Sequence, residues 1–251
     1  MILDEIVRHT QKRVAHLPSE FPENGARSHA SLIEAIWNRD GRNAVIAEIK
    51  CASPSRGIIR RNVDMAMMAG ALAEKGCVAL SVLTEPYYFG GAGRDIEKVK
   101  SAVRIPVLRK DFIIDERQIV ESIVLGADAV LLIAAVLKDR LPIFVNLAQE
   151  NGLEPLVEVH TTSEVESALS TNAKLIGINN RNLSTLRIDR STTRLLSECV
   201  RSAGRTIVSE SGILTCDDIR EMKPYCDAFL IGSSFMAHDR PEKKLEEFVC
   251  A

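Results

Sequence analysis

The sequence predicts a (β/α)8 barrel that follows an N-terminal helical extension. Past residue 43, eight short apolar runs alternate with eight longer amphipathic segments. Strands separated by helical crossovers must be parallel, and eight such units can close on themselves. The length of 251 residues is ordinary for such a barrel, and no linker rich in Pro, Gly or Ser divides the chain. We therefore expect one domain over residues 1–251, with the extension at 1–43 and the barrel at 44–251.

Each expected strand is a mainly apolar run of four to six residues. The expected strands are Ala44–Ile49, Val78–Leu83, Pro106–Arg109, Ala129–Ile133, Pro155–Val159, Leu175–Ile178, Thr206–Ser209 and Ala228–Ile231. The expected helices are Asp64–Lys75, Asp95–Val103, Asp115–Leu125, Lys138–Asn151, Ser163–Leu169, Arg190–Ala203, Cys216–Lys223 and Pro241–Val249. Capping boxes at 161–164 and 215–218 mark two helix starts. An open doubly wound sheet is the alternative, but no G-x-G-x-x-G follows the first strand.

The extension carries two apolar stripes of its own. Ile2–Leu17 has the spacing of an amphipathic helix, and Leu32, Ile33, Ile36 and Trp37 form a shorter stripe. One interpretation is a helical plug over hydrophobic surface. The other is that the extension caps the catalytic mouth and contributes to substrate closure. A barrel has two ends, so the sequence leaves both open.

Composition and charge narrow the possible partners and location. Apolar residues make up 46% of the chain, and 32 basic against 34 acidic residues leave a net charge of −2. This balance argues against a nucleic acid or a membrane surface as partner. The six cysteines show no C-x-x-C spacing, which favours free thiols in a reducing compartment. Without a visible secretory signal or membrane span, we expect a soluble cytoplasmic protein, monomeric or weakly self-associating.

Charged residues gather where the expected strands end. In barrels the active site lies at the carboxyl ends of the strands. Those ends carry Glu48, Lys50, Lys110, Glu158 and Glu210, with Phe112, Asn179 and Arg181 beside them. Glutamate beside lysine permits general acid and base work without a metal or an organic cofactor. Opposite charges packed together keep each other ionised, while partial burial can lower the pKa of a lysine there.

A second group of residues is typical of a phosphate site. The turns Ser211-Gly212 and Gly232-Ser233 follow the last two strands, where barrels often hold a phosphate, and Ser53 follows the first. Cys51 alternates away from the Glu48 face and is expected to pack. We expect His160 to lie one residue beyond the last inward-facing position and to have a structural role. Lys98, Lys100 and Asp189–Ser191 are interpreted as solvated surface.

The motifs resemble those of the indole-3-glycerol phosphate synthase family over almost the whole chain. Besides Glu48–Gly57, the matching segments are Leu108–Ile114, Gly126–Ile133, Leu156–His160, Ile176–Asn182, Val208–Ile213 and Phe229–Phe235. The resemblance implies a substrate, 1-(2-carboxyphenylamino)-1-deoxyribulose 5-phosphate, whose indole ring closes with loss of carbon dioxide and water. It implies no metal and no cofactor.

The resemblance also implies residue roles. Lys110 would be the general acid and Glu158 the base; whether Lys50, which would contact the substrate carboxylate, shares the acid role stays open. Glu48 and Asn179 would orient the lysines and the substrate hydroxyls, and Arg181 and Glu210 would complete the polar wall. Phe89, Phe112 and Leu183 would pack on the aromatic ring. The phosphate would lie among Ser53, Ser211, Gly212, Gly232 and Ser233. Cys51 departs from the pattern, since a basic residue often stands there, so one contact to the substrate is expected to be missing.

Three other functions remain as alternatives. Phosphoribosylanthranilate isomerase is also a phosphate-binding barrel, but it uses a Cys/Asp pair where this chain has Glu48 and Lys50. A Schiff-base aldolase would use Lys50 or Lys110 as nucleophile. A non-catalytic sugar-phosphate-binding partner is the last, although every catalytic position carries the matching residue.

Overall fold

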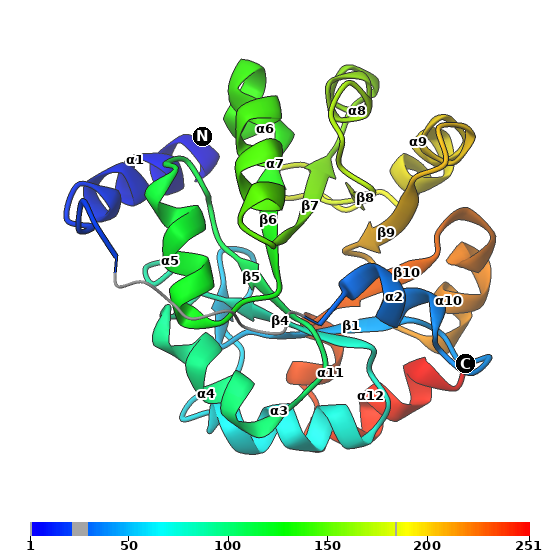
Figure 1. Ribbon diagram of the computed structural model, residues 1–251. Coiled ribbons are helices and arrows are strands. Elements are labelled where there is room, and N and C mark those ends of the chain that lie inside the picture. Colours follow the sequence, from blue (N-terminus) through cyan, green and yellow to red (C-terminus); the bar gives the residue numbers. More distant parts are fainter. Residues whose placement is uncertain (1, 22–29, 184) are drawn as a thin grey trace.

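The described residues form a closed barrel of eight parallel strands surrounded by helices (Figure 1). The computed structural model describes residues 2–21, 30–183 and 185–251. Around the barrel the strand order is β1-β10-β9-β8-β7-β6-β5-β4. The strands are β1 (Val45–Ile49), β4 (Ala79–Leu83), β5 (Val107–Lys110), β6 (Ala129–Ile133), β7 (Glu154–Val159), β8 (Leu175–Asn179), β9 (Thr206–Glu210) and β10 (Ala228–Ile231). The predicted barrel is confirmed, and each strand lies within one residue of its predicted ends.

The helices that cross between the strands also follow the prediction closely. They are α3 (Met65–Glu74), α4 (Arg94–Ala102), α5 (Arg117–Leu125), α7 (Leu141–Glu150), α8 (Thr162–Leu169), α9 (Ser191–Ser202), α10 (Cys216–Met222) and α12 (Pro241–Val249). Thr215 and Asp218 complete a capping box at α10. At α8 only one half of the predicted capping box forms. The Thr161 side chain accepts the N–H of Glu164, but the Glu164 carboxylate accepts the N–H of His160 and not that of Thr161.

Several short elements were not predicted. They are the hairpin β2 (Ala52–Ser53) and β3 (Gly57–Ile58), the helices α6 (Ala134–Leu137) and α11 (Ser233–Met236), and the 3-10 turns η1 (Lys138–Arg140) and η2 (Lys223–Tyr225). The segment predicted as one helix from Lys138 is divided into η1 and α7. Lys138 has φ of +50°, which ends α6, and Pro142 in the first turn of α7 fits a new helix start.

Alternation along each strand separates two apolar layers. Side chains that point outward pack under the helices, as Val45, Leu80 and Val107 do. Side chains that point inward fill the barrel, as Ile46 and Leu108 do. Near the carboxyl ends, the inward positions of β1, β5, β7, β8 and β9 carry polar groups, whereas those of β4, β6 and β10 stay apolar.

The two helices of the extension cover opposite ends of the barrel. Helix α1 (Ile2–Val14) lies at the carboxyl ends, where Arg13 bonds the Thr84 carbonyl at 3.1 Å and Asp111 at 2.7 Å. Helix α2 (Leu32–Trp37) lies at the amino ends. There Glu154, the first residue of β7, accepts the backbone N–H groups of Leu32 and Ile33. Both interpretations of the extension are therefore right in part, and substrate closure stays a prediction.

Candidate active site

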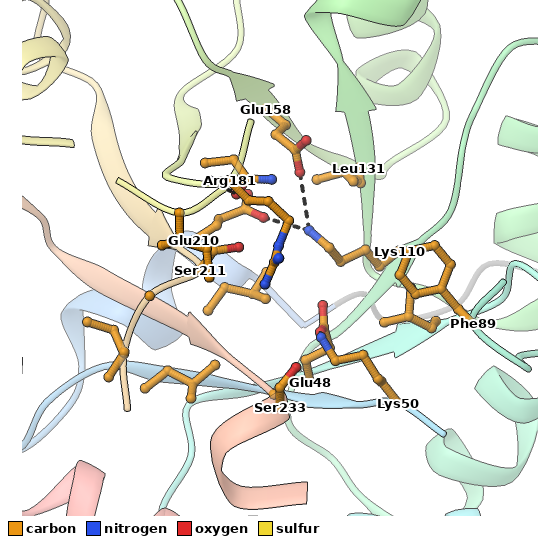
Figure 2. A pocket seen from close by; sticks show the side chains of 18 of the residues that line it. Glu48, Lys50, Phe89, Lys110, Leu131, Glu158, Arg181, Glu210, Ser211 and Ser233 are labelled. Atoms are coloured by element: carbon orange, nitrogen blue, oxygen red, sulfur yellow. Dashed lines mark hydrogen bonds and ion pairs between the residues drawn. The ribbon is translucent and has the colours of Figure 1, made fainter. Parts of the chain in front are cut away.

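Lys110 lies at the centre of a pocket at the carboxyl ends of the strands. As the last residue of β5 it points inward, with Nζ 3.3 Å from Glu158 Oε2 and 2.5 Å from Glu210 Oε2 (Figure 2). Burial alone would lower the pKa of Lys110, but the carboxylates of Glu210, Glu158 and Glu48 outweigh it and raise that pKa. The expectation of a lowered lysine pKa is therefore wrong for Lys110, which is held as an ammonium.

The two glutamates beside Lys110 differ in their protonation. Burial disfavours the charge of both. For Glu158, the attraction of Lys110 and His160 outweighs burial and lowers the pKa. For Glu210, burial and repulsion from Glu158 dominate and raise the pKa to about 7. An ionised carboxylate and a carboxyl that titrates near neutrality therefore contact the same ammonium, an arrangement typical of acid–base sites.

A second lysine–glutamate pair comes from β1 and the residue after it. Glu48 and Lys50 point inward two residues apart, and their side chains form an ion pair. Although burial opposes its charge, Lys50 and Lys110 lower the pKa of Glu48. Asn179 ends β8, and its side-chain oxygen accepts the N–H of Arg181 at 3.0 Å, so it also shapes the chain that carries that guanidinium.

The predicted phosphate turns lie on the same pocket. Ser211 and Gly212 both have left-handed backbones, with φ of +65° and +93°. Strain of this kind at a serine persists only where neighbours enforce it. Asn180 Nδ2 donates to the Ser211 carbonyl at 3.0 Å, and Arg190 Nη1 donates to the Gly212 carbonyl at 3.3 Å.

The other parts of the predicted phosphate site lie close by. Gly232 and Ser233 begin the short helix α11, and both line the pocket. Ser53 lines an adjoining pocket that shares Lys50, Arg181 and Ser233 with the first. Its Oγ is buried and has no hydrogen-bond partner among the described residues. This hydroxyl is therefore able to form a hydrogen bond with a group bound in the pocket.

Aromatic and apolar side chains form the wall between the two pockets. Phe89, Phe112 and Leu183 line both, and the rings of Phe89 and Phe112 lie 6.3 Å apart. The loop that carries Phe89 is held by Glu85, whose carboxylate accepts the N–H groups of residues 87, 88 and 89. Glu85 therefore shapes the wall from outside the pocket.

Some residues of the site were not among the candidates named from the sequence. Arg56 lines the pocket and donates to the Ser233 carbonyl at 3.3 Å, and no ion pair joins it to a carboxylate in the described part of the chain. A basic residue in a Ser/Pro/Gly loop was the available signal. Leu131, Ile133 and Ile188 add apolar lining. Nothing in the local pattern distinguishes them from other core residues.

Three minor expectations need correction. His160 is two residues from Glu158 and therefore on the same face, with Nε2 3.4 Å from Glu158 Oε1. Lys100 is not simply solvated, since it pairs with the buried Asp128 at 2.7 Å. Arg190 forms ion pairs with Asp218 and Glu221. Cys51 agrees with a packing role, since burial raises the pKa of its thiol.

Among the described residues, none of the helices combines the length and the apolar character that a membrane span requires. Within the same residues, no cluster of three His, Cys, Asp or Glu side chains is arranged to hold a metal ion.

Fold and site together define a (β/α)8-barrel enzyme with an acid–base cluster at its mouth. The model of the family described as "Indole-3-glycerol phosphate synthase" matches residues 3–248. The chain belongs to the indole-3-glycerol phosphate synthase family and is a carboxy-lyase. This membership decides against the isomerase and aldolase alternatives.

Individual relatives agree with the family match. The chain is 43% identical to the indole-3-glycerol phosphate synthase of Caldanaerobacter subterraneus, over 99% of this chain and 98% of that protein. It is 44% identical to the enzyme of the same name from Bordetella pertussis, over 89% and 85%. A tryptophan synthase structure from M. tuberculosis superposes with a TM-score of 0.64 at 14% identity, covering 88% of this chain and 99% of that one. That likeness concerns the fold alone.

Proposed function

We propose that this chain converts 1-(2-carboxyphenylamino)-1-deoxyribulose 5-phosphate to indole-3-glycerol phosphate with Lys110 as general acid and Glu158 as base. The supporting observation is the contact of the Lys110 ammonium with Glu158 and Glu210 inside the pocket. A carbon–carbon bond forms between the ring carbon that bears the carboxylate and the ketone carbon. Lys110 gives a proton to the ketone oxygen as its negative charge develops.

The later steps reuse the same groups. The ring carboxylate leaves as carbon dioxide, and its bonding electrons restore the ring. The hydroxyl formed from the ketone then leaves as water with a second proton, while Glu158 takes the proton released from the substrate. Overall the carboxylate leaves as carbon dioxide and the ketone oxygen leaves as water. Of the two protons in that water, one is balanced by the proton that the substrate releases to Glu158 and the other comes from solution, so Lys110 must be recharged in each turnover.

Binding is divided among three parts of the mouth. Arg181 and Lys50 are the cations that suit the substrate carboxylate. The turns at Ser211-Gly212 and Gly232-Ser233, with Ser53 beside them, offer backbone N–H and hydroxyl groups to the phosphate. Phe89, Phe112 and Leu183 offer an apolar wall to the aromatic ring.

The direct test is a fluorescence assay for indole-3-glycerol phosphate formed from the carboxyphenylamino substrate. The native chain should give product that grows with enzyme concentration. Lys110→Met should lower kcat about a hundredfold or more, because a positioned acid contributes about 10²–10⁴-fold. Lys243→Met, at an exposed position of α12, is the matched control and should behave as wild type. Near-normal kcat in a folded Lys110→Met enzyme would contradict the role of Lys110.

Lys50→Met separates the two lysines. If Lys50 only binds the carboxylate, this variant should raise KM more than it lowers kcat. A loss of kcat equal to that of Lys110→Met would assign Lys50 a share of the acid role.

A further inference from the structure

Glu158 is flanked on both carboxylate oxygens by groups that can carry positive charge. Oε2 lies 3.3 Å from the Lys110 ammonium, and Oε1 lies 3.4 Å from Nε2 of His160. The other ring nitrogen, Nδ1, lies 3.1 Å from Glu164 Oε2. The same Glu164 oxygen accepts the His160 backbone N–H at 2.8 Å, which fixes the ring relative to α8. A line of groups thus runs from Glu164 through His160 and Glu158 to Lys110.

Glu210 lacks this second cationic partner. It contacts the same ammonium through Oε2, and its buried Oε1 has no hydrogen-bond partner among the described residues. His160 Nε2 makes no hydrogen bond there either, so its contact with Glu158 is an ion pair at 3.4 Å. The two glutamates therefore share Lys110 and contact each other, and Glu158 has two further partners, His160 and the Asn179 side chain. When Lys110 gives its proton to the substrate, Glu210 loses the one cation that it contacts, whereas Glu158 still faces the imidazole.

The surroundings of His160 favour its protonated form. The carboxylates that act on it are Glu158 on β7, Glu164 on α8 and Glu210 on β9, with the Lys110 ammonium beyond Glu158. Burial opposes the charge, but these carboxylates outweigh it and raise the pKa of His160. His160 is 11% exposed and lines neither pocket, so it influences the reaction through neighbouring carboxylates, of which Glu158 is in contact with it.

We propose that His160 is a positioning residue whose imidazolium makes Glu158, and not Glu210, the base of the reaction. The proposal rests on the proposed role of Glu158. By attracting one carboxylate oxygen, the imidazolium keeps Glu158 ionised and aims its other oxygen at Lys110. Glu210, without that partner, becomes the carboxylate that takes up a proton more easily.

The test compares the pH profile of kcat/KM for wild type and His160→Gln. Without the imidazolium, the midpoint of the acid limb of the kcat/KM profile should rise by about one pH unit. Below that midpoint, kcat/KM of the variant should be about tenfold lower than that of wild type. Near pH 9 the two profiles should agree within about twofold, because Glu158 is ionised there with or without the imidazolium. His16→Gln, at an exposed position, is the matched control and should leave the profile unchanged. A loss of equal size at every pH would mean a merely structural role and would overturn the proposal.

A measurement without turnover covers the case in which His160→Gln folds poorly. NMR titration of the His160 ring should give a pKa above 6.5 in wild type, and Glu164→Gln should lower it by about one unit. Glu166→Gln, at an exposed position on the same helix, should leave it unchanged. A wild-type His160 that titrates below 6.5 would overturn the proposal.

Glu158→Gln distinguishes this proposal from the function on which it rests. If that variant keeps near-normal activity, Glu158 is not the base and the role of His160 falls with it. If Glu158→Gln is inactive while His160→Gln keeps the wild-type pH profile, the base is correct and only the inference about His160 is wrong.

Discussion

Glu210 and Glu48 fit inside the barrel because the residues facing them are glycines. A Cβ added at Gly177 on β8 would overlap the Glu210 carboxylate, and one at Gly232 would lie 2.7 Å from Glu48 Oε1. Neither glycine has a left-handed backbone. These two glycines are therefore needed because they leave room for a neighbouring carboxylate, and not because of the backbone freedom of glycine.

Gly177→Ala should weaken catalysis without removing any charged group. The added methyl displaces the Glu210 carboxylate from Lys110, so kcat should fall about tenfold or more. Overpacking should lower the free energy of unfolding by about 1–3 kcal/mol. Steady-state kinetics and urea denaturation check this. Gly70→Ala in α3, where an added Cβ meets nothing within 4 Å, is the control and should keep wild-type kinetics.

Glu210 should also make stability depend on pH. Its pKa is raised from 4.5 to about 7 in the folded chain, so the folded state binds more protons than the unfolded state between these values. The free energy of unfolding should therefore fall as pH rises through this window, by on the order of 3 kcal/mol from this group. Urea denaturation at pH 5 and pH 8 measures this effect. The difference in the free energy of unfolding between the two pH values should lose the contribution of Glu210 in Glu210→Gln. Identical pH dependence in variant and wild type would contradict the shift.

At the scale of elements, a buried ionic network connects α1 to the loop after Lys110. Asp111 accepts from Arg13 of α1 at 2.7 Å and from Arg109 of β5 at 3.1 Å, and Thr84 Oγ1 donates to it at 2.6 Å. Burial opposes the charge of Asp111, but the two guanidinium groups lower its pKa. The same helix places Ile2, Leu3 and Ile6 on the pocket that adjoins the acid–base cluster.

Arg13→Met should loosen α1 over the mouth. The variant removes two hydrogen bonds of a charged group, so the free energy of unfolding should fall by about 1–3 kcal/mol. Asp111 keeps Arg109 as partner, so Lys110 should stay in place, with KM rising severalfold and kcat within about twofold of wild type. Lys12→Met, at an exposed position of the same helix, is the control. An unchanged KM would mean that α1 has no part in binding.

At the scale of the molecule, stability and chemistry lie at opposite ends of the barrel. The acid–base cluster and the phosphate turns lie at the carboxyl ends, under α1. Helix α2 closes the amino ends, where Leu32 and Ile36 are fully buried against the interior layer. Barrels commonly divide their two faces in this way.

Leu32→Ala should therefore affect stability alone. Truncating a fully buried leucine costs about 2–5 kcal/mol, whereas kcat and KM should stay within about twofold of wild type at temperatures where the variant is folded. Urea denaturation and steady-state kinetics measure the two effects separately. Ile143→Ala, at a side chain 54% exposed on α7, should change neither.

Much of the site could be predicted from two rules: side chains alternate along a strand, and the active site of a barrel lies at the carboxyl ends of its strands. They place Glu48, Lys110, Glu158 and Glu210 at one mouth from sequence spacing alone. The same alternation could have placed His160 on the inward face together with Glu158, but the sequence-based prediction placed it outside that face. Arg56 could not be placed, because its position depends on a hairpin of two short strands that no periodicity reveals.

The sequence by itself determined the barrel, its family and the identity of the charged groups, because periodicity and motif order are local properties of the chain. Tertiary structure alone decided the protonation of those groups. The pKa of Lys110 rises instead of falling because three carboxylates from three strands surround it. The pKa values of Glu158 and Glu210 diverge because Lys110, His160 and Asn179 outweigh burial at Glu158, whereas burial and the charge of Glu158 prevail at Glu210. Electrostatic effects depend on distances through space, and distances between strands are fixed only when the barrel closes.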